Sequence, residues 1–286
     1  MEIKTLEGID TKDILDAFNA CFSNYYITLQ FTHEQLVSKI FENNVKLELS
    51  VGVFRENKLV AFILNGLGLK HENKAVYNAG TGVLPKDRNQ GLSKKMHDSI
   101  LPLRLEQGLE FSILEVISEN EAALKTYEKF GYQPVRDLFC YFGKPTFSDP
   151  NPDIEIKKLE SFDWDLMQSF WDIKPTWQNS VHSINRVYAN LVSLGAFLDH
   201  QLVGYIIYNP ENGRLKQIAI QQNSRRKGIA TCLLLKALEN NKPTLSVINV
   251  DEKGDSLINF LEKIGLAKEL VQMEMSLKLM AGSTNE

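Results

Sequence analysis

Arg88-Asn89-Gln90-Gly91-Leu92-Ser93 and Arg225-Arg226-Lys227-Gly228-Ile229-Ala230 are two copies of one turn motif, 137 residues apart (225 − 88 = 137). Each copy follows an apolar segment with strand character and precedes a segment whose apolar residues have helical spacing. Two more pairs match in the same order: Gly131 with Gly265, and the stretch 53–62 with 197–205. Three ordered matches at nearly constant spacing predict a duplicated domain.

The length agrees with a duplication, because 286 residues are about twice the ~100–200 that are typical of one domain. The seam is Lys144-Pro145-Thr146-Phe147-Ser148-Asp149-Pro150-Asn151-Pro152, in which three prolines stand among small polar residues. Such a segment cannot continue a helix or a central strand and is typical of a linker. We therefore expect an N-terminal domain over residues 1–143, a linker over 144–152 and a C-terminal domain over 153–286.

The composition excludes several classes of protein. Hydrophobic residues make up 43% and charged residues 24%, as in an ordinary globular chain. A net charge of −4 supplies no extended basic face, so we expect no nucleic-acid partner. Cys21, Cys140 and Cys232 lack metal-ligand spacing, which predicts a reducing compartment and no metal site. No leader pattern and no apolar run of about 18 residues is visible, so we expect a cytoplasmic protein without a membrane partner.

The order of apolar patterns predicts the fold class. In the first half, helical spacing covers 12–22, 34–41, 91–105 and 120–130, and strand character covers 47–54, 59–64, 75–84, 111–117 and 135–142. The second half also has strands at its middle, followed by strand, helix, strand, helix and strand. This order predicts an α/β protein in which each half has a mixed central sheet flanked by helices. Only one clear strand follows Gly131 or Gly265, and either a strand is shared between the halves or each sheet is shorter.

The turn motif is suited to binding an anion. A helix is expected to begin at Gly91 and at Gly228, and a helix N-terminus offers unpaired N–H groups and a partial positive charge to a phosphate. Glycine lets the backbone approach the anion, and Arg88 or Arg225 would add a positive fork. The alternative is an ordinary turn with a solvated arginine, which two copies after matched strands disfavour.

The motif resembles the acetyl-CoA loop of the GCN5-related N-acetyltransferases (GNAT family), Gln/Arg-x-x-Gly-x-Gly/Ala. Residues 225–230 fit it fully, whereas Ser93 replaces the last small apolar residue in the first copy. The first half also carries the family's second motif, Asn120-Glu121-Ala122-Ala123-Leu124-Lys125-Thr126-Tyr127-Glu128-Lys129-Phe130-Gly131-Tyr132, with Tyr132 in place of phenylalanine. The resemblance implies two tandem GNAT-like domains and acetyl-CoA as the cofactor. The cofactor-binding residues that it implies are Val83, Arg88, Asn89, Gln90, Gly91, Leu92, Ser93, Asn120, Arg225, Gly228 and Ala230.

Two residues of the first half are candidates for acid–base chemistry. An alkyl amine with a pKa near ~10.4 is almost entirely protonated at neutral pH, so a base is needed to activate it. Glu115 is a lone charge in an apolar strand, and the resemblance implies a base at its distance from Tyr127; the alternative is a carboxylate facing solvent. The resemblance also implies that Tyr127 is the general acid for the leaving thiolate, although Ala123, Tyr127 and Phe130 share a helical face and Tyr127 can equally be a core aromatic. Asn120 can cap its helix or bind the pantetheine arm.

The strand 75–84 contains Gly80 and Gly82, which would permit a bulge and close approach of the cofactor; the alternative is a weakened strand. In the family this strand separates from the next one, and backbone N–H groups in the gap would hold the oxyanion. A shift of 134 residues places Glu115 on Asn249, Asn120 on Gly254 and Tyr127 on Leu261. The second half therefore keeps the loop without the acid–base residues.

The function we expect is an acetyl-CoA-dependent N-acetyltransferase that transfers acetyl directly to a primary amine, with Glu115 as base and Tyr127 as acid. The acceptor is a small-molecule amine or a peptide N-terminus, and the oligomeric state stays open. The alternative is a non-catalytic sensor or scaffold protein that binds acyl-CoA.

Overall fold

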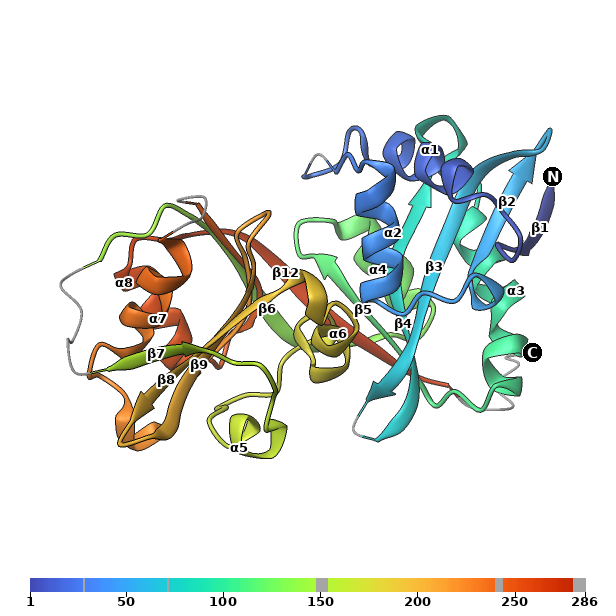
Figure 1. The fold of residues 1–286 in the computed structure, drawn as a ribbon. Coiled ribbons are helices and arrows are strands. Elements are labelled where there is room, and N and C mark those ends of the chain that lie inside the picture. The colour runs from blue at the N-terminus through green and yellow to red at the C-terminus, as the bar shows by residue number, and fades with distance from the viewer. Residues whose placement is uncertain (28, 71, 148–153, 240–243, 280–286) are drawn as a thin grey trace. The chain divides into compact units, whose positions relative to one another are not determined.

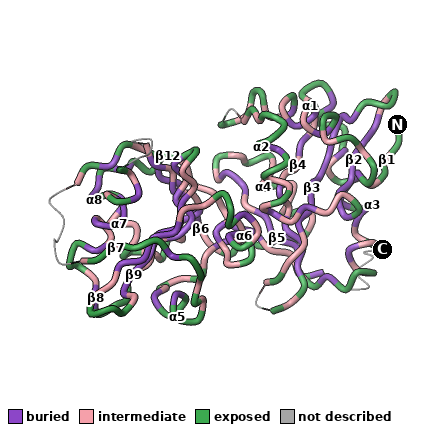
Figure 2. Tube along the Cα trace, in the orientation of Figure 1, coloured by how far each residue is buried: buried purple, intermediate pink, exposed green. Residues whose placement is uncertain are grey.

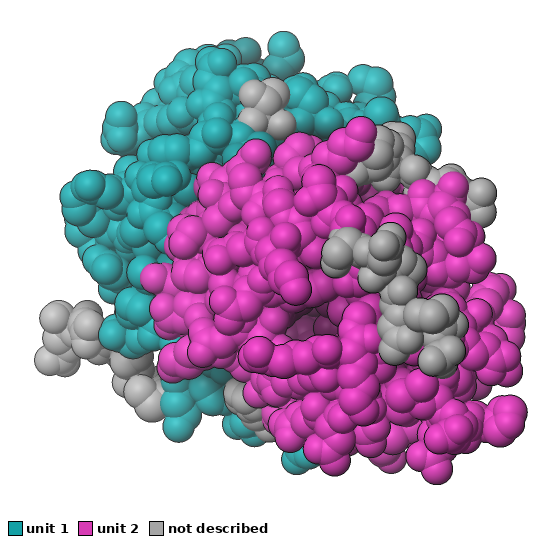
Figure 3. Space-filling model, turned by 90° about the vertical axis from the view of Figure 1, so that its left-hand side faces the viewer, with its two compact units in different colours: residues 1–135, 273–286 teal, residues 136–272 magenta. Residues whose placement is uncertain are grey.

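The computed structural model describes residues 1–27, 29–70, 72–147, 154–239 and 244–279. The chain divides into two compact units, unit 1 with residues 1–135 and 273–286 and unit 2 with residues 136–272 (Figure 3). Residues 148–152 of the expected linker lie outside the described residues. Among the helices of the described ranges, none combines the length and the apolar character that a membrane span requires.

Unit 1 has a sheet with the strand order β1-β2-β3-β4-β5-β12 (Figure 1). β4 is antiparallel to β3 and parallel to β5, so the sheet is mixed. The elements of the unit are β1 (Glu2–Thr5), α1 (Thr11–Phe22), α2 (His33–Glu42), β2 (Val51–Arg55), β3 (Lys58–Lys70), β4 (Asn73–Val83), α3 (Leu92–Glu106), β5 (Phe111–Ile117), α4 (Glu121–Lys129) and the end of β12 (Ala267–Lys278).

Helices cover both faces of this sheet. On one face, Phe18 of α1 stacks on Phe62 of β3 with ring centroids 5.8 Å apart. On the other face, α3 packs against Val51, Val53 and Ile63, and α4 packs against Leu114 and Val116. The alternation of side chains along a strand explains why neighbouring residues such as Phe62 and Ile63 contact different helices. The buried residues accordingly follow the central strands (Figure 2).

Helix boundaries in unit 1 follow their capping residues. The Asp10 side chain accepts a hydrogen bond from the Lys12 backbone at the start of α1. Thr32 and Gln35 form a capping box at the start of α2. Such caps satisfy backbone N–H groups that a helix leaves without partners, and each contributes roughly 0.5–2 kcal/mol.

Unit 2 repeats this architecture with the strand order β6-β11-β10-β9-β8-β7. β10 is antiparallel to β9 and parallel to β11. The elements are β6 (Gln133–Gly143), β7 (Glu155–Lys158), α5 (Trp164–Gln168), α6 (Val181–Arg186), β8 (Val192–Leu198), β9 (Gln201–Asn209), β10 (Arg214–Ile220), α7 (Ile229–Leu238), β11 (Leu245–Asp251) and α8 (Asp255–Lys263). The predicted α/β class and the two similar halves are thus observed.

Two strands are exchanged between the halves of the sequence. β6 follows Gly131 in the chain, yet its residues 138–143 pair with β11 inside unit 2. The final strand β12 belongs to the second half, yet its residues from Met273 onward lie in unit 1, next to β5 in the strand order. A shared strand, one of the two alternatives left open by the sequence, is therefore what the structure shows.

Candidate functional site

The central feature of unit 1 is a gap between β4 and β5. The two strands pair only from Ala75 to Tyr77 on β4 and from Phe111 to Ile113 on β5. Beyond these residues β4 continues to Val83 and β5 to Ile117 without further pairing to each other among the described residues. A register shift against β3 at Ala79 marks a bulge in β4 at this point. The predicted separation of the strands is thus present.

The first turn motif connects β4 to the N-terminus of α3. Asn89 and Gly91 have positive φ angles of 62° and 70°, and no side chain caps α3. A Cβ at Gly91 would meet no atom within 4 Å, so the space beside Gly91 is open. Open space at an uncapped helix N-terminus fits a phosphate group.

Arg88 holds this loop in place. Its Nε donates to the Val83 carbonyl at 3.3 Å and one Nη to the Cys21 carbonyl at 3.0 Å. Buried Asp87 also fixes the loop, because its carboxylate forms an ion pair with Arg55 at 3.1 Å. Arg55 also donates to the Gln90 side chain. These two bonds leave Arg88 one N–H of the bonded Nη and both N–H groups of the other Nη for a ligand.

Tyr127 lies on α4 with its phenol at the bulge of β4. The ring is partly buried against Tyr132, with centroids 5.6 Å apart. Thr81 and Asn78 hydrogen-bond the phenol. Burial raises the pKa of the Tyr127 phenol to about 12, and the bonds to Thr81 and Asn78 act in the opposite direction. The phenol is therefore protonated at neutral pH and available as a hydrogen-bond donor.

Glu115 lies on the opposite face of the sheet from Tyr127. Its neighbours Leu114 and Val116 contact α4, so the alternation along β5 directs Glu115 to the face that α1 covers. There the buried Tyr77 of β4 donates a hydrogen bond to the Glu115 carboxylate. A carboxylate on one face and a phenol on the other thus flank the same gap.

Asn120 and Tyr25 meet at the N-terminus of α4. Asn120 Oδ1 accepts from the Ala123 backbone at 3.1 Å, which is the expected helix cap. Its Nδ2 donates to the Tyr25 hydroxyl at 2.9 Å. Burial raises the pKa of Tyr25, and the bond from Asn120 opposes that rise. Asn120 therefore caps the helix and at the same time orients a second phenol.

Gly80 and Gly82 have a packing role on β4. A Cβ at Gly82 would lie 2.7 Å from the Phe62 ring and 3.0 Å from Cys21 Cβ, and a Cβ at Gly80 would lie 3.6 Å from Phe18. Gly82 thus lets α1 approach the sheet, and the bulge itself falls at Ala79.

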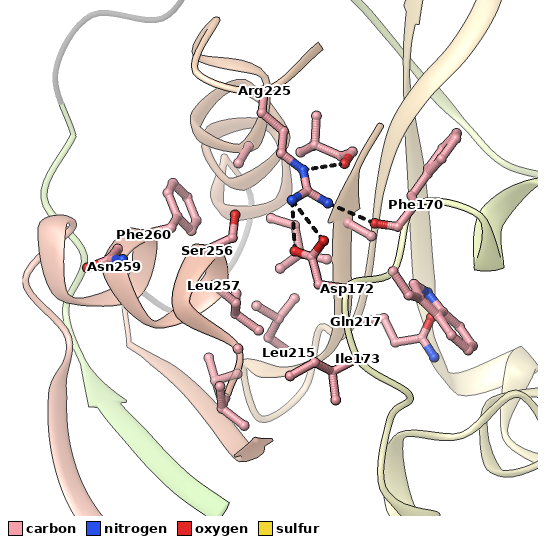
Figure 4. Close-up of a pocket in the computed structure, with 18 of the residues that line it drawn as sticks. Phe170, Asp172, Ile173, Leu215, Gln217, Arg225, Ser256, Leu257, Asn259 and Phe260 are labelled. Carbon is pink, nitrogen blue, oxygen red and sulfur yellow. Dashed lines mark hydrogen bonds and ion pairs between the residues drawn. The ribbon is translucent and has the colours of Figure 1, made fainter. Parts of the chain in front are cut away.

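A cavity of about 1510 Å³ occupies the corresponding position in unit 2 (Figure 4). It is lined by the second turn motif, the start of α7 including Gly228 and Ala230, the end of β10 and the start of α8. Arg225 repeats the anchoring seen at Arg88, with Nε 2.9 Å from the Ile220 carbonyl and Nη 3.0 Å from the Phe170 carbonyl. Its other Nη binds both carboxylate oxygens of Asp172 at 3.0 and 2.7 Å. The Asp172 carboxylate thus neutralises Arg225, so the predicted positive fork is occupied by the protein's own groups in unit 2.

At the described positions of unit 2 that align with Glu115, Asn120 and Tyr127, the side chains differ. Gly254 is the N-cap of α8 where Asn120 caps α4, and no side chain caps that helix. Leu261 takes the place of Tyr127 and is fully buried. Asn249, the counterpart of Glu115, is buried in a bulge of β11.

Sequence reasoning missed four side chains at the gap of unit 1: Tyr25, Tyr77, Asn78 and Thr81. Tyr25 lies in an undistinctive connection after α1, and no sequence signal places it at the site. Asn78 and Thr81, however, interrupt an apolar strand, and the 137-residue shift aligns them with Leu215 and Ile218. That difference between the two copies could have identified them.

Comparisons with known proteins agree with this architecture. The model of the acetyltransferase (GNAT) family matches residues 11–132 and again 156–266. A GCN5-related N-acetyltransferase from Sphaerobacter thermophilus superposes with a TM-score of 0.74 at 14% identity, covering 98% of this chain and 96% of that one. A tandem GNAT protein from the clavulanic acid biosynthesis pathway superposes with a TM-score of 0.72 at 12% identity, covering 99% and 100% of the two chains. No curated protein matches the sequence. With both halves matched by the family model, the chain belongs to the acetyltransferase (GNAT) family and contains two GNAT domains in tandem.

Proposed function

We propose that unit 1 is an acetyl-CoA-dependent N-acetyltransferase that acts on a primary amine. The observation that carries this proposal is the placement of Glu115 and Tyr127 on the two faces of one gap between β4 and β5. The uncapped N-terminus of α3 at Gly91 lies at the end of the same strand β4. Membership of the acetyltransferase family supports acyl transfer as the reaction class.

Each group has a distinct part in the chemistry. Acetyl-CoA, when bound, supplies the acetyl group as a thioester whose leaving group is a thiolate. The N–H groups at Leu92 and Ser93, with Asn89, Gln90 and the free end of Arg88, would hold its diphosphate. Glu115 takes a proton from the incoming ammonium group, which leaves the nitrogen lone pair free to form the new C–N bond.

Tyr127 acts on the other side of the gap. With acetyl-CoA bound, its O–H would donate to the sulfur of the thioester and compensate the negative charge of the leaving thiolate. Asn120 holds the N-terminus of α4, so the helix that carries Tyr127 is fixed relative to its first turn. Direct transfer needs no covalent intermediate on the protein.

The experiment measures release of the CoA thiol from acetyl-CoA with a panel of alkylamines, amino acids, aminoglycosides and peptide N-termini. Glu115→Gln and Tyr127→Phe should each lower kcat by about 10²–10⁴-fold, the usual contribution of a positioned acid or base. Matched controls are Glu110→Gln, an exposed carboxylate just before β5, and Tyr188→Phe, an exposed tyrosine of unit 2. A Tyr127→Phe variant as fast as the unaltered protein would remove the assigned acid.

The cavity of unit 2 favours a second candidate function, binding of acyl-CoA without turnover. The loop with Arg225, Gly228 and Ala230 lines this cavity, whereas Leu261 cannot donate a proton. This candidate predicts that CoA binds, as measured by calorimetry, while no amine in the panel accelerates thiol release. Turnover that depends on Glu115 and Tyr127 would contradict it as the whole function.

A further inference from the structure

Three polar side chains meet at the bulge of β4 in unit 1: Asn78, Thr81 and Tyr127. Asn78 Nδ2 donates to Thr81 Oγ1 at 2.8 Å. The Thr81 hydroxyl donates to Asn78 Oδ1 at 3.2 Å and lies within hydrogen-bonding reach of the Tyr127 phenol. Asn78 Oδ1 in turn accepts the Gly80 backbone N–H at 3.0 Å. The bulge therefore fixes Asn78, Asn78 fixes Thr81, and Thr81 contacts the phenol.

The face of the sheet explains why these groups can meet. Thr81 is paired with Ile63, whose side chain packs against α3, so Thr81 also faces the α3 and α4 side. The bulge at Ala79 brings Asn78 to that same face. Tyr127 lies on α4, the helix that covers this face of the sheet.

The second copy of the domain differs from the first at all three positions. The 137-residue shift that aligns the turn motifs aligns Asn78 with Leu215 and Thr81 with Ile218. Leu215 and Ile218 belong to one apolar cluster, and Leu261, the counterpart of Tyr127, belongs to the same cluster. All three polar side chains are thus replaced by aliphatic ones, while Arg225 and Gly228 of the loop are retained. Because Asn78, Thr81 and Tyr127 are all present in one copy and all replaced in the other, we treat these three side chains as one functional group.

We infer that Thr81 and Asn78 are positioning residues that orient the Tyr127 phenol toward the leaving sulfur of the acyl donor. This inference rests on the proposed transfer reaction in unit 1 and adds two residues to it. The Thr81 hydroxyl has one hydrogen, which in this structure goes to Asn78 Oδ1 at 3.2 Å. When that hydrogen turns to the phenol oxygen, it directs the phenol's own O–H away from β4. The same bond stabilises the negative charge that the phenol oxygen acquires when it gives up its proton to the sulfur. Asn78 keeps the Thr81 hydroxyl in this role by donating to its oxygen.

The experiment is a double-mutant cycle on thiol release from acetyl-CoA, using the amine of the panel that reacts fastest. Thr81→Val keeps the shape of the side chain and removes the hydroxyl, and it should lower kcat by about tenfold, with the KM for acetyl-CoA changed less than about twofold. Thr81→Ser restores the hydroxyl and should recover most of the rate. Asn78→Asp keeps the acceptor for Gly80 and removes the donor to Thr81, so it should also lower kcat. Thr126→Val is the matched control, because that hydroxyl donates to the Ala122 carbonyl within α4 at 2.7 Å.

The decisive comparison uses the Tyr127→Phe background. If Thr81 acts through the phenol, Thr81→Val should have almost no further effect there, whereas a purely structural role would give additive losses. A Thr81→Val variant with unchanged kcat, or additive losses in the cycle, overturns the inference while the assigned acid stands. A fast Tyr127→Phe variant instead overturns the proposed function itself, so the two failures are distinguishable.

Discussion

Met275→Ala tests whether the last strand of the chain completes the core of unit 1. Met275 lies on β12, is fully buried, and packs with Leu114, Val116 and Tyr132. Truncating a buried methionine loses its transfer free energy and leaves a cavity, at a cost of about 2–5 kcal/mol. In a unit of this size, each 1 kcal/mol lowers Tm by roughly 2–4 °C. A mid-range loss of about 3 kcal/mol should therefore lower the Tm of unit 1 by roughly 6–12 °C.

The assay is hydrogen exchange resolved by peptide. Met275→Ala should accelerate exchange in the peptide that covers Phe111–Ile117 of β5, and leave the peptide that covers Arg214–Ile220 of β10 unchanged. Met167→Ala is the matched control, because Met167 is equally buried in the core of unit 2 and should give the reverse pattern. Faster exchange confined to β10 in Met275→Ala would refute the strand exchange.

The same substitution should also affect the proposed chemistry. Tyr127 packs against the cluster that contains Met275, so a cavity there gives the phenol more freedom. We expect thiol release to fall in Met275→Ala even below the new Tm. Met167→Ala should leave it unchanged at temperatures where unit 1 is folded.

Two further predictions concern stability. Gly82→Ala puts a Cβ 2.7 Å from the Phe62 ring and should cost about 1–3 kcal/mol in urea denaturation. Gly80→Ala, whose Cβ would lie 3.6 Å from Phe18 without a positive φ, should cost less, and equal losses would contradict the packing role. Burial lowers the pKa of His97 to about 4, below its usual 6.5, so protonation favours the unfolded chain. Stability should therefore be complete above pH 6.5 and fall by up to about 3 kcal/mol as the pH drops toward 4. Urea midpoints that show the same pH dependence in His97→Phe would contradict this assignment.

Much of the fold could be predicted from the sequence because its signals are local. Consecutive residues determine the cap of α4 at Asn120, the turn at Gly91 and the helical spacing after that turn. Because the domain is duplicated, the turn motif and the strand that precedes it each occur twice in the sequence. The exchange of β6 and β12 is not local, because either strand has the same apolar alternation whichever sheet it joins.

The site was predictable to the extent that its motifs are contiguous. Glu115 and Tyr127 were identified from the resemblance of a contiguous stretch to the family, and the structure places both at the gap between β4 and β5. Tyr77 could not be identified in this way, since its contact with Glu115 depends on the parallel register of two strands 38 residues apart. Thr81 and Asn78 depend on a bulge whose position the glycines did not reveal.

The pKa of Tyr127 sets how the phenol can assist a leaving thiolate. A thiol has a pKa near ~8.5, so a phenol whose pKa is about 12 holds its proton more tightly than the thiolate would take it. The phenol therefore acts on the developing thiolate first as a hydrogen-bond donor, and charge-assisted bonds of this kind are roughly twice as strong as neutral ones. The hydrogen bond from Thr81 already lowers this pKa, so complete transfer of the proton is still less favourable without it. Thr81 is placed to supply that bond, which gives a chemical reason why a domain copy that lost the phenol has no use for the threonine or the asparagine.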